Sequence, residues 1–388
     1  MYPHQSERLS QALARAGLDA LIASSPANVA YVTGLLTSGD ARSRRYAVYS
    51  PRGTALVVPA SDLPVLVAEG VAVDHLIGHG ALGATFTVPA TAETRRIESL
   101  AGDVVAEPIE ALLVALSRLG ATHGPVGLDE SGLGHDEWRA FGDRLTESRL
   151  TLAAAHLAEA RRVKGPYELE CLGHALRIAE EALDAVIQVI DRGMTEREAA
   201  QLYSGEVVKR GAWPMAARVA IGEGAALPWS WPTDRALRAG DLVRFDVSCT
   251  YRGYAGSVAR MAVLGEPSER AEAVHASLQI GLETAVGAIT PGVVAGRVFD
   301  TALARVRASG ILDDGGGDVG HGIGLEFREP PTLDAAGTEV LDAGEVLQIE
   351  LRHVAVGSMG LVLRDTLLVT SAGARSLNRS RRDLIVLD

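Results

Sequence analysis

The chain has 388 residues, of which 47% are hydrophobic, so it is long and apolar enough for two or three folded domains and is not a disordered protein. Its 37 basic and 49 acidic residues give a formal net charge of −12, which argues against a general nucleic-acid binder and against docking on anionic lipid. Two cysteines, Cys171 and Cys249, are too few for a disulfide framework or a cysteine-based zinc site, and they fit a reducing compartment.

The opening segment, MYPHQSERLSQALARAG, has no apolar run of signal-peptide length. The rest of the chain has no uncharged apolar stretch of about 18 residues, the length expected of a membrane-spanning helix. We therefore expect a soluble cytoplasmic protein with no membrane partner.

The first 155 residues alternate between helical and strand patterns. Ser25-Pro26 is a helix-start signal that follows the first apolar strand pattern. Helices are predicted over residues 6–16, 61–70, 107–119 and 134–145, and strands over 19–24, 54–59 and 125–130. This alternation predicts an α/β domain with a largely parallel sheet.

A charged joint, Arg161-Arg162-Val163-Lys164-Gly165-Pro166, separates this half from the next, and Pro166 can open a helix that runs to about Asp191. The second half contains a strand-turn-strand pattern and then two long helical patterns before two further strands. These cover residues 242–264, 268–289, 294–309, 346–352 and 360–370. The order predicts an α+β domain around an antiparallel sheet, with the domain boundary near residue 155.

Several stretches follow, in order, the landmarks of the creatinase/aminopeptidase-P/prolidase family. They are LDALIASSPANVAYVTGL, RRVKGPYELECL, ALPWSWPTDRALRAGDLVRFDVSCTYRGYAGSVAR, GHGIGLEFREPP, VLQIELR and LVLRDTLLVT. The chain resembles this family over nearly its whole length. The resemblance implies an α/β N-terminal domain, residues 1–155, and an α+β "pita-bread" C-terminal domain, residues 156–388, with a curved antiparallel sheet. It also implies a homodimer.

Metallopeptidases of this family hold two divalent metals with five side chains: Asp, Asp, His, Glu and Glu. The resemblance places Asp246, His321 and Glu350 at three of these positions. At the other two, Ser257 replaces the second aspartate and Arg364 replaces the second glutamate. The sequence therefore retains an incomplete set of metal ligands.

The charge of the site changes with these replacements. The family's four carboxylates balance two divalent ions, whereas here two carboxylates face Arg364 and, nearby, Arg328. Because unpaired buried charges are costly, we predict that Arg364 bridges Asp246 and Glu350 in place of the missing cation. We expect no metal or other cofactor, although a single zinc held by Asp246, His321 and Glu350 stays open as an alternative.

Two accessory histidines of the family are also replaced. The histidine of its LPHG motif corresponds to Trp229, and the one in GLEVHEPP corresponds to Arg328, whereas the following glutamate is kept as Glu329. Creatinase is the family's precedent for a site without metals, but it uses a histidine at the LPHG-like position. Trp229 and Trp231 are expected either to form an aromatic wall of the substrate pocket or to pack in the core.

The remaining candidate residues can be given roles from their chemistry. His321 is the candidate general acid/base, or else a structural histidine in a glycine-rich turn. Glu350 or Glu329 would orient a water or a cationic nitrogen of the substrate. Asp246 and Glu350 are catalytic in this reading, or else form a buried ion pair with Arg364 and have no chemical role.

The other positions are assigned to substrate binding. Arg328 and Arg364 would hold a carboxylate, which the guanidinium fork matches. Ser257 would fill the volume of the lost ligand. His353, three residues after Glu350, would lie near the site.

The main functional hypothesis is a metal-independent enzyme acting on a small carboxylate-bearing substrate. Its reaction would be hydrolysis of a C–N bond, or related lyase, isomerase or cyclase chemistry. One alternative is a non-catalytic protein that binds a ligand or peptide in the old pocket. The other is a residual mononuclear metallopeptidase of the Xaa-Pro type.

Overall fold

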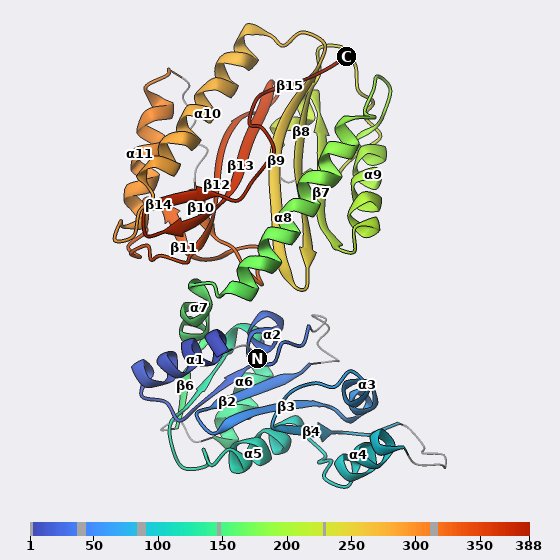
Figure 1. The fold of residues 1–388 in the computed structure, drawn as a ribbon, viewed down its shortest axis with the longest axis vertical. Coiled ribbons are helices and arrows are strands. Elements are labelled where there is room, and N and C mark those ends of the chain that lie inside the picture. The colour runs from blue at the N-terminus through green and yellow to red at the C-terminus, as the bar shows by residue number, and fades with distance from the viewer. Residues whose placement is uncertain (1–2, 37–43, 84–90, 146–148, 228–229, 311–316) are drawn as a thin grey trace. The chain divides into compact units, whose positions relative to one another are not determined.

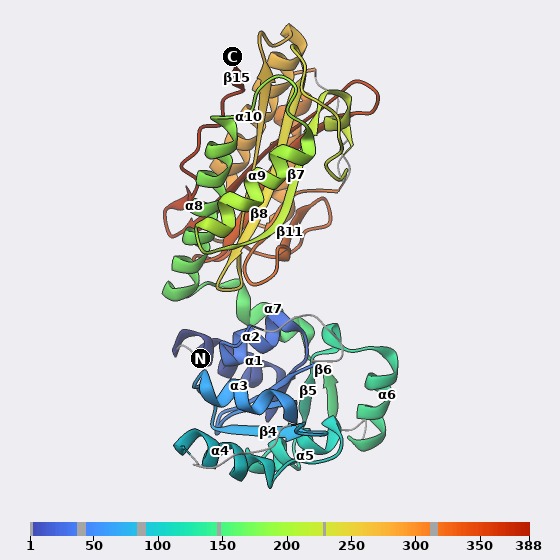
Figure 2. The same ribbon diagram turned by 90° about the vertical axis from the view of Figure 1, so that its right-hand side faces the viewer.

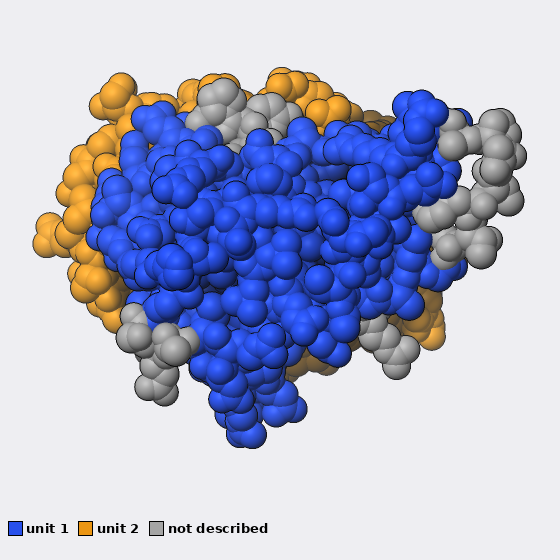
Figure 3. Space-filling model, turned by 90° about the horizontal axis from the view of Figure 1, so that it is seen from below, with its two compact units in different colours: residues 1–161 blue, residues 162–388 orange. Residues whose placement is uncertain are grey.

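The computed structural model describes residues 3–36, 44–83, 91–145, 149–227, 230–310 and 317–388. The chain divides into two compact units, Met1–Arg161 and Arg162–Asp388, which are coloured separately in Figure 3. The domain boundary predicted near residue 155 falls within the helix Ala154–Arg162, which ends at this division. None of the helices in the described ranges has the length and apolar composition needed to cross a membrane.

Unit 1 is built around a mixed sheet with the strand order β4-β3-β2-β1-β5-β6. Its strands are β1 Ala20–Ala23, β2 Tyr46–Ser50, β3 Gly53–Pro59, β4 His75–His79, β5 Val126–Leu128 and β6 Leu150–Leu152. Its helices are α1 Pro3–Ala16, α2 Pro26–Thr33, α3 Leu63–Ala68, α4 Ala92–Ala101, α5 Pro108–Arg118, α6 His135–Arg144 and α7 Ala154–Arg162. Figures 1 and 2 show α5 on one side of this sheet and α1 and α2 on the other.

The sheet of unit 1 is less parallel than the sequence pattern predicts. The pairs β1–β5, β5–β6 and β3–β4 are parallel, but β2 pairs antiparallel with both β1 and β3. Only two residues separate the end of β2 at Ser50 from the start of β3 at Gly53, and such a short connection can join only antiparallel strands. The predicted α/β class is confirmed, with a mixed sheet instead of a largely parallel one.

Unit 2 contains the antiparallel sheet that the sequence predicts, with the strand order β11-β10-β12-β13-β9-β8-β7. Its strands are β7 Trp213–Ile221, β8 Leu242–Tyr251, β9 Tyr254–Leu264, β10 Asp318–Gly322, β11 Glu329–Asp334, β12 Val346–Ala355, β13 Met359–Thr370, β14 Gly373–Ser376 and β15 Ile385–Leu387. Its helices are α8 Pro166–Ile187, α9 Glu196–Lys209, α10 Glu269–Ala288 and α11 Ala295–Arg307, and a short helix, η4, spans Gly222–Ala226. The α+β fold with an antiparallel sheet is thus confirmed.

The turn in the strand-turn-strand pattern predicted over residues 242–264 is a two-residue hairpin between β8 and β9. Arg252 and Gly253 both have positive φ, 49° and 81°, as a type I′ turn requires. This turn fixes the register of β8 against β9, in which Asp246 lies opposite Ala259 and Ser248 opposite Ser257. The hairpin therefore aligns the residues that build the candidate site.

The strands of unit 2 have one face in the core and one face free to build a pocket. On β8, Val243, Phe245 and Val247 pack with side chains of α8 and α9 in one hydrophobic cluster. On β12, Ile349 and Leu351 pack with α10 and α11 in another. Because side chains alternate along a strand, the residues between them point to the opposite face of the sheet.

Candidate functional site

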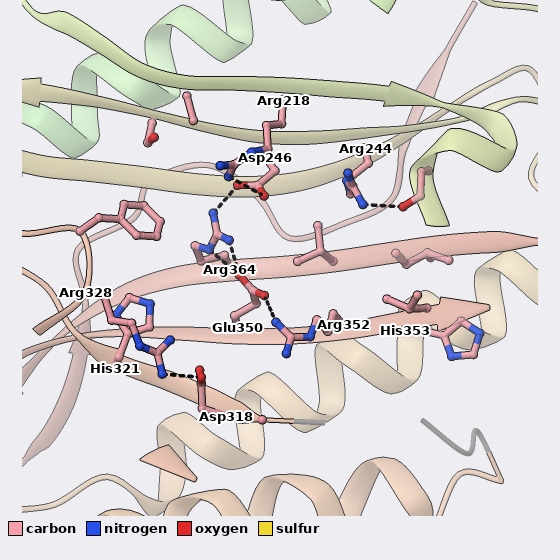
Figure 4. A pocket seen from close by; sticks show the side chains of 18 of the residues that line it. Arg218, Arg244, Asp246, Asp318, His321, Arg328, Glu350, Arg352, His353 and Arg364 are labelled. Carbon is pink, nitrogen blue, oxygen red and sulfur yellow. Dashed lines mark hydrogen bonds and ion pairs between the residues drawn. The ribbon is translucent and has the colours of Figure 1, made fainter. Parts of the chain in front are cut away.

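A pocket with a cavity volume of about 550 Å³ lies on the face of the unit 2 sheet away from the core. This volume is within the range of small-molecule sites, which is roughly 300–1,000 Å³. The charged and histidine side chains that line it come mainly from five strands (Figure 4): Arg218, Arg244, Asp246, Asp318, His321, Arg328, Glu350, Arg352, His353 and Arg364. The pocket is therefore rich in charged side chains, above all arginine.

Strand register places the central side chains of the pocket in one row. Glu350 on β12 lies opposite Arg364 on β13, Arg364 lies opposite Ala259 on β9, and Ala259 lies opposite Asp246 on β8. Directly opposed residues in antiparallel strands have their side chains on the same side of the sheet. Since Ala259 contributes only a methyl group, the long side chain of Arg364 lies across it and reaches Asp246.

Arg364 joins the two acidic residues, as predicted. Its Nη1 donates to Asp246 Oδ1 at 2.5 Å and to Ser257 Oγ at 3.0 Å, and its Nε donates to Glu350 Oε2 at 2.7 Å. Its Nη2 also pairs with Glu350. Figure 4 shows the guanidinium between the two carboxylates. The prediction that Arg364 bridges Asp246 and Glu350 is confirmed by this geometry.

The charges of this cluster stabilise each other. Burial alone would lower the pKa of Arg364, but the carboxylates of Asp246 and Glu350 outweigh burial and raise this pKa above its ordinary value. Burial would likewise raise the pKa of Glu350, but Arg364 and Arg352 lower it below the ordinary carboxyl value. Both groups are therefore ionised at neutral pH.

Two more arginines extend the cluster on either side. Arg352 Nη1 donates to Glu350 Oε1 at 3.0 Å, and Arg218 Nη1 lies 3.9 Å from Asp246 Oδ2. Arg352 is two residues after Glu350 on β12, and Arg218 lies opposite Asp246 in the β7–β8 register. The result is an alternating series of three guanidinium groups and two carboxylates along one side of the pocket.

His321 stands on β10, at another side of the pocket. Its Nδ1 lies 2.9 Å from the carbonyl oxygen of Gly322, which can only accept, so the proton is on Nδ1 and Nε2 carries the lone pair. Burial lowers the pKa of His321, the Gly322 hydrogen bond partly opposes this, and the positive charges of Arg328 and Arg364 lower it further. A neutral imidazole with a basic Nε2 results at neutral pH.

Gly322 allows the close strand contact that holds His321 in place. A Cβ at this position would stand 2.2 Å from the carbonyl oxygen of Pro330 on β11, closer than real Cβ atoms approach backbone. A glycine is therefore needed for β10 to lie against β11. The neighbouring ring of Phe327 has its centroid 5.8 Å from that of His321 and also lies 5.6 Å from the Cζ of Arg364.

The donor set does not fit the two-metal centre that the family resemblance implies. Arg364 stands between Asp246 and Glu350, so the space that a divalent ion would need holds a guanidinium. Ser257 Oγ is a hydrogen-bond partner of Arg364 and of the Val247 carbonyl. Across the residues that the structure describes, no group of three or more His, Cys, Asp or Glu side chains is arranged to hold a metal ion.

Three other predicted binding residues lie at the pocket or directly behind it. Arg328 and His353 line the pocket, and Arg328 Nη2 donates to Asp318 Oδ2 at 2.6 Å. Ser257 is fully buried behind Arg364. These three positions thus belong to the same site as Asp246, His321 and Glu350.

Two predicted binding residues are not brought to the pocket. Trp231 is 83% exposed and is not among its lining residues, so it forms neither the predicted aromatic wall nor part of the core. Glu329 is buried and pairs instead with Lys164, whose Nζ lies 2.9 Å from Glu329 Oε2. Trp229 lies outside the described residues.

Sequence reasoning missed three arginines of the pocket, Arg218, Arg244 and Arg352. Two of them could have been predicted from the sequence, because Arg244 is two residues before Asp246 and Arg352 is two residues after Glu350. A strand period of two puts such neighbours on the same face. Arg218 had no such signal, since its strand, β7, was not predicted.

Comparison with known families matches both halves of the chain. Residues 170–371 match Metallopeptidase family M24, and residues 5–163 match the Creatinase/Prolidase N-terminal domain. These matches confirm the family resemblance that the sequence motifs predict.

Individual relatives are distant in sequence. An uncharacterized peptidase, YqhT, of Bacillus subtilis is 23% identical over 98% of this chain and 99% of its own length. A Xaa-Pro dipeptidase of Pyrococcus furiosus is 30% identical over 59% of this chain and 66% of its own length. The crystal structure of the prolidase from Pyrococcus horikoshii has a TM-score of 0.81 with 22% identity, covers 98% of this chain and 99% of that one, and shows that the fold is shared.

Proposed function

Since this chain belongs to metallopeptidase family M24, as the match over residues 170–371 establishes, we propose that it hydrolyses an amide C–N bond in a small carboxylate-bearing molecule without a bound metal. The single observation that carries the metal-free part of the proposal is the position of Arg364. Its guanidinium pairs with both Asp246 and Glu350 and, together with Arg352 and Arg218, compensates their negative charges. Family membership supports the hydrolytic part, because the named relatives are peptidases.

His321 is the general base of this proposal. Its Nε2 takes a proton from a water molecule, whose oxygen forms a bond to the amide carbon. The C–N bond then breaks as the same proton passes to the leaving nitrogen, so one water is consumed and an acid and an amine are released. The lowered pKa of His321 keeps this imidazole neutral and able to accept the proton near pH 7.

Arg364 has the donor that the developing oxyanion needs. A guanidinium has five N–H groups, and four are used in the bonds to Asp246, Ser257 and Glu350, which leaves one N–H on Nη2 among the described contacts. A charged donor that is already aimed at a forming oxyanion stabilises it strongly. Asp246 and Glu350 then act as positioning residues, since they hold the guanidinium. Arg328, which pairs with Asp318, would exchange this partner for a substrate carboxylate.

The test of this proposal is turnover by the His321→Ala variant. A panel of N-acyl amino acids and dipeptides is incubated with the protein, and release of free amine is followed. His321→Ala should lower the rate by about 100-fold or more, the usual contribution of a general base. The exposed His135 of unit 1 serves as the matched control, and His135→Ala should keep the full rate. Undiminished turnover by His321→Ala contradicts the assigned role.

A metal-dependent peptidase is the second candidate, and the comparisons favour it over the metal-free reading. The family is named for metallopeptidases, and one relative is named a Xaa-Pro dipeptidase. Such an enzyme would have to use Asp246, His321 and Glu350, and Arg364 would first have to leave the two carboxylates. Elemental analysis of protein purified without chelators, together with assays on Xaa-Pro dipeptides, decides between the two. One equivalent of Zn, Mn, Fe or Co that activity requires overturns the metal-free proposal.

A binding protein without catalysis is the third candidate. It is favoured by the loss of both accessory histidine positions, which hold Trp229 and Arg328 here. Calorimetry and amine-release assays on the same compounds separate this candidate from the first two. Tight binding with no product over many hours would favour it, and product formation excludes it.

The assembly and compartment are part of the same proposal. We propose a homodimer, which the family resemblance supports, that works in the cytoplasm on a small molecule and has no nucleic-acid or membrane partner. Cys171 and Cys249 are both free and buried, which fits a reducing compartment. Light scattering of the purified protein measures the mass, and a monomer at micromolar concentration would contradict the dimer.

A further inference from the structure

Among the described residues of unit 2, one buried arginine has no carboxylate partner. Arg244, Arg260 and Arg364 are 4%, 1% and 6% exposed. Arg260 and Arg364 each donate to at least one carboxylate at 2.9 Å or less. Arg244 donates instead to two neutral main-chain carbonyls, and no described carboxylate lies within ion-pair distance of it. A buried guanidinium that pairs with no anion is costly, so its environment needs an explanation.

The guanidinium of Arg244 is held against η4. Its Nη1 donates to the carbonyl oxygen of Ala225 at 2.5 Å, and its Nη2 donates to that of Leu227 at 2.8 Å. Its Nε is buried and has no acceptor in the described part of the chain. A guanidinium carries five N–H groups, so each terminal nitrogen retains one N–H beyond these two bonds. The arginine is therefore anchored and still has donors for a ligand.

The positive charge of Arg244 is compensated less well than that of Arg364. Burial lowers the pKa of Arg244, and the carboxylates of Asp246 and Glu350, which raise this pKa, do not fully offset burial. The same two carboxylates raise the pKa of Arg364 above its ordinary value, because they are hydrogen-bonded to it. An anion in direct contact with Arg244 would stabilise its charge in the same way.

Arg244 is within reach of a ligand, because it lines the pocket of about 550 Å³. It is two residues before Asp246 on β8, and side chains with that spacing lie on the same face of a strand. Figure 4 shows both side chains pointing to the same side of β8. Two residues of a strand span about 7 Å, so a small molecule bound at Arg244 extends to the pair formed by Asp246 and Arg364.

Arg328 is the alternative position for a substrate carboxylate. Its side chain is 50% exposed, and its Nη2 donates to Asp318 Oδ2 at 2.6 Å. A ligand carboxylate at Arg328 would have to displace Asp318 and compete with water. Arg244 has no carboxylate to give up, and a charged hydrogen bond formed in its buried position is stronger than one formed at the surface.

The surroundings of Arg244 favour an anion with a single charge. A carboxylate has one charge and two coplanar oxygens, which match the N–H groups of a guanidinium. Asp246 and Glu350 are close enough to raise the pKa of Arg244, so they also repel an incoming anion. This repulsion is twice as large for a dianion such as sulfate as for a carboxylate at the same distance.

We propose that Arg244 binds the carboxylate of the substrate and so makes the pocket select an acid over the corresponding neutral amide. The inference rests on the proposed function for the nature of the ligand, which is a small amide that carries a carboxylate. The binding itself is independent of turnover. Arg244 is then a specificity-determining residue, whereas His321 and Arg364 act at the amide bond.

The proposal is tested by calorimetry with matched probes on the unaltered protein. N-acetylglycine and N-acetylglycinamide have nearly the same size, and only the first carries a carboxylate. The acid should bind about tenfold more tightly or better, the usual worth of one charged hydrogen-bonded contact. Sulfate should bind no more tightly than N-acetylglycine. Equal affinities for the two amides, tighter binding of sulfate, or no binding of the acid each overturn the assignment.

Variants locate the carboxylate. Arg244→Met should reduce the affinity for N-acetylglycine to that for N-acetylglycinamide, while the affinity for N-acetylglycinamide stays within about threefold. Arg328→Gln should keep the preference for the acid, and loss of the preference in this variant would place the carboxylate at Arg328 and overturn the assignment. Arg197→Gln, on the exposed surface of α9, is the matched control and should bind both probes as the unaltered protein does.

A second substitution at the same position guards against misfolding. Arg244→Lys keeps the positive charge, but an ammonium cannot hold both carbonyls and also offer a fork to a carboxylate. It should bind N-acetylglycine about threefold more weakly or worse, with little change for N-acetylglycinamide. A folded variant at position 244, Met or Lys, that retains the full preference for the acid overturns the assignment.

A last variant separates this inference from the proposed reaction. His321→Ala should prefer N-acetylglycine over N-acetylglycinamide as the unaltered protein does, even where turnover is lost. A preference for the acid in a protein that hydrolyses nothing would leave this inference standing and contradict only the hydrolytic function. Hydrolysis without any such preference would contradict this inference alone.

Discussion

Two arginines of unit 2, Arg260 and Arg364, are both buried and both paired with carboxylates, yet their surroundings differ. Arg260 is 1% exposed, and its guanidinium donates to Asp365 Oδ1 at 2.9 Å and to the carbonyl oxygens of Arg381 and Ala259 at 2.8 and 2.9 Å. Further bonds run to the Arg364 carbonyl and to Ser380, so every N–H of Arg260 has an acceptor. Arg364 lines a cavity and retains one N–H that the described contacts do not use.

This difference separates a structural arginine from a candidate functional one. Arg260 pins the segment at 380–382 to the sheet, and its partner Asp365 also accepts from Arg382 at 2.7 Å. Arg364 faces the opposite way, although it is the neighbour of Asp365 on β13. Burial and charge pairing are the same in both places, so it is access to a cavity and an unused donor that mark Arg364.

The largest expected effect comes from rebuilding the family's donor set at Arg364. The double variant Ser257→Asp/Arg364→Glu restores four carboxylates beside His321, and we expect it to bind Mn²⁺ or Zn²⁺ with a Kd of about 1 μM, or roughly −8 kcal/mol. Calorimetry on protein stripped of metal measures this affinity. Ser257→Asp alone keeps the guanidinium and should bind no metal. A folded double variant that ignores both ions would show that Arg364 does not stand in a former cation position.

The second prediction concerns Arg260. Arg260→Met removes a guanidinium from a site with no access to water and leaves Asp365 with Arg382 alone, which should cost about 3–5 kcal/mol of the free energy of unfolding. Urea unfolding followed by tryptophan fluorescence gives this value. Ligand affinity of the folded fraction should be unchanged. A loss below about 1 kcal/mol would mean that the network contributes little to stability.

The third prediction makes the same substitution at Arg364. Arg364→Met should cost about 1–3 kcal/mol in unfolding, less than Arg260→Met, because water in the pocket can solvate Asp246 and Arg352 still pairs with Glu350. Turnover should fall much more than stability does. If the two variants lose equal stability and Arg364→Met keeps its turnover, the two arginines are equivalent and the distinction drawn between them is wrong.

The smallest effect is on the pH dependence of turnover. Because the folded protein lowers the pKa of His321, this base stays neutral below the ordinary histidine pKa of about 6.5. The acidic limb of kcat/KM should therefore lie below about pH 6.5. Arg328→Gln removes one of the charges that lower this pKa, so the limb should move to higher pH. A limb above pH 7 in the unaltered protein would contradict the assigned base.

The lowered pKa of His321 also makes the stability of the fold depend on pH. A histidine whose pKa is lower in the folded than in the unfolded state has no effect on stability while it is neutral in both states. As the pH falls through the unfolded value of about 6.5 toward the folded one, the unfolded state binds a proton that the folded state does not, so stability is lost. His321→Ala should remove this part of the acid sensitivity. Thermal unfolding of both proteins between about pH 5 and pH 7 measures this change in acid sensitivity.

The sequence predicts most of the fold because its local signals agree with the tertiary structure. The Ser25-Pro26 signal opens α2, whose N-cap is Ser25, and Pro166 begins α8. One strand, β7, was not predicted. It lies at the edge of the sheet and carries Arg218. Its sequence, WPMAARVAI, has a proline and an alanine pair and lacks the alternation that identifies a strand, so its pairing with β8 decides its structure.

The centre of the site was also predictable, but its periphery was not. Ser257 and Arg364 stand at positions where the family motif fixes the expected residue, so each departure was visible in one sequence. Trp231 and Glu329 also stand in motif positions, but position along the chain does not tell which way a side chain points. Lys164, from the joint between the domains, reaches Glu329 through a contact that only folding creates.

Arg364 gives the pocket a cation that is synthesised with the chain. A divalent ion has to be acquired after folding, competes with other metals and can be removed by a chelator, whereas a guanidinium is in place as soon as β13 pairs with β12 and β9. The positive charge beside Asp246 and Glu350 is then part of the polypeptide and does not vary with the metal content of the cell. The cost is adjustability, because a guanidinium keeps one charge and one planar geometry, and the proposed metal-free enzyme could not be switched off by withholding a metal.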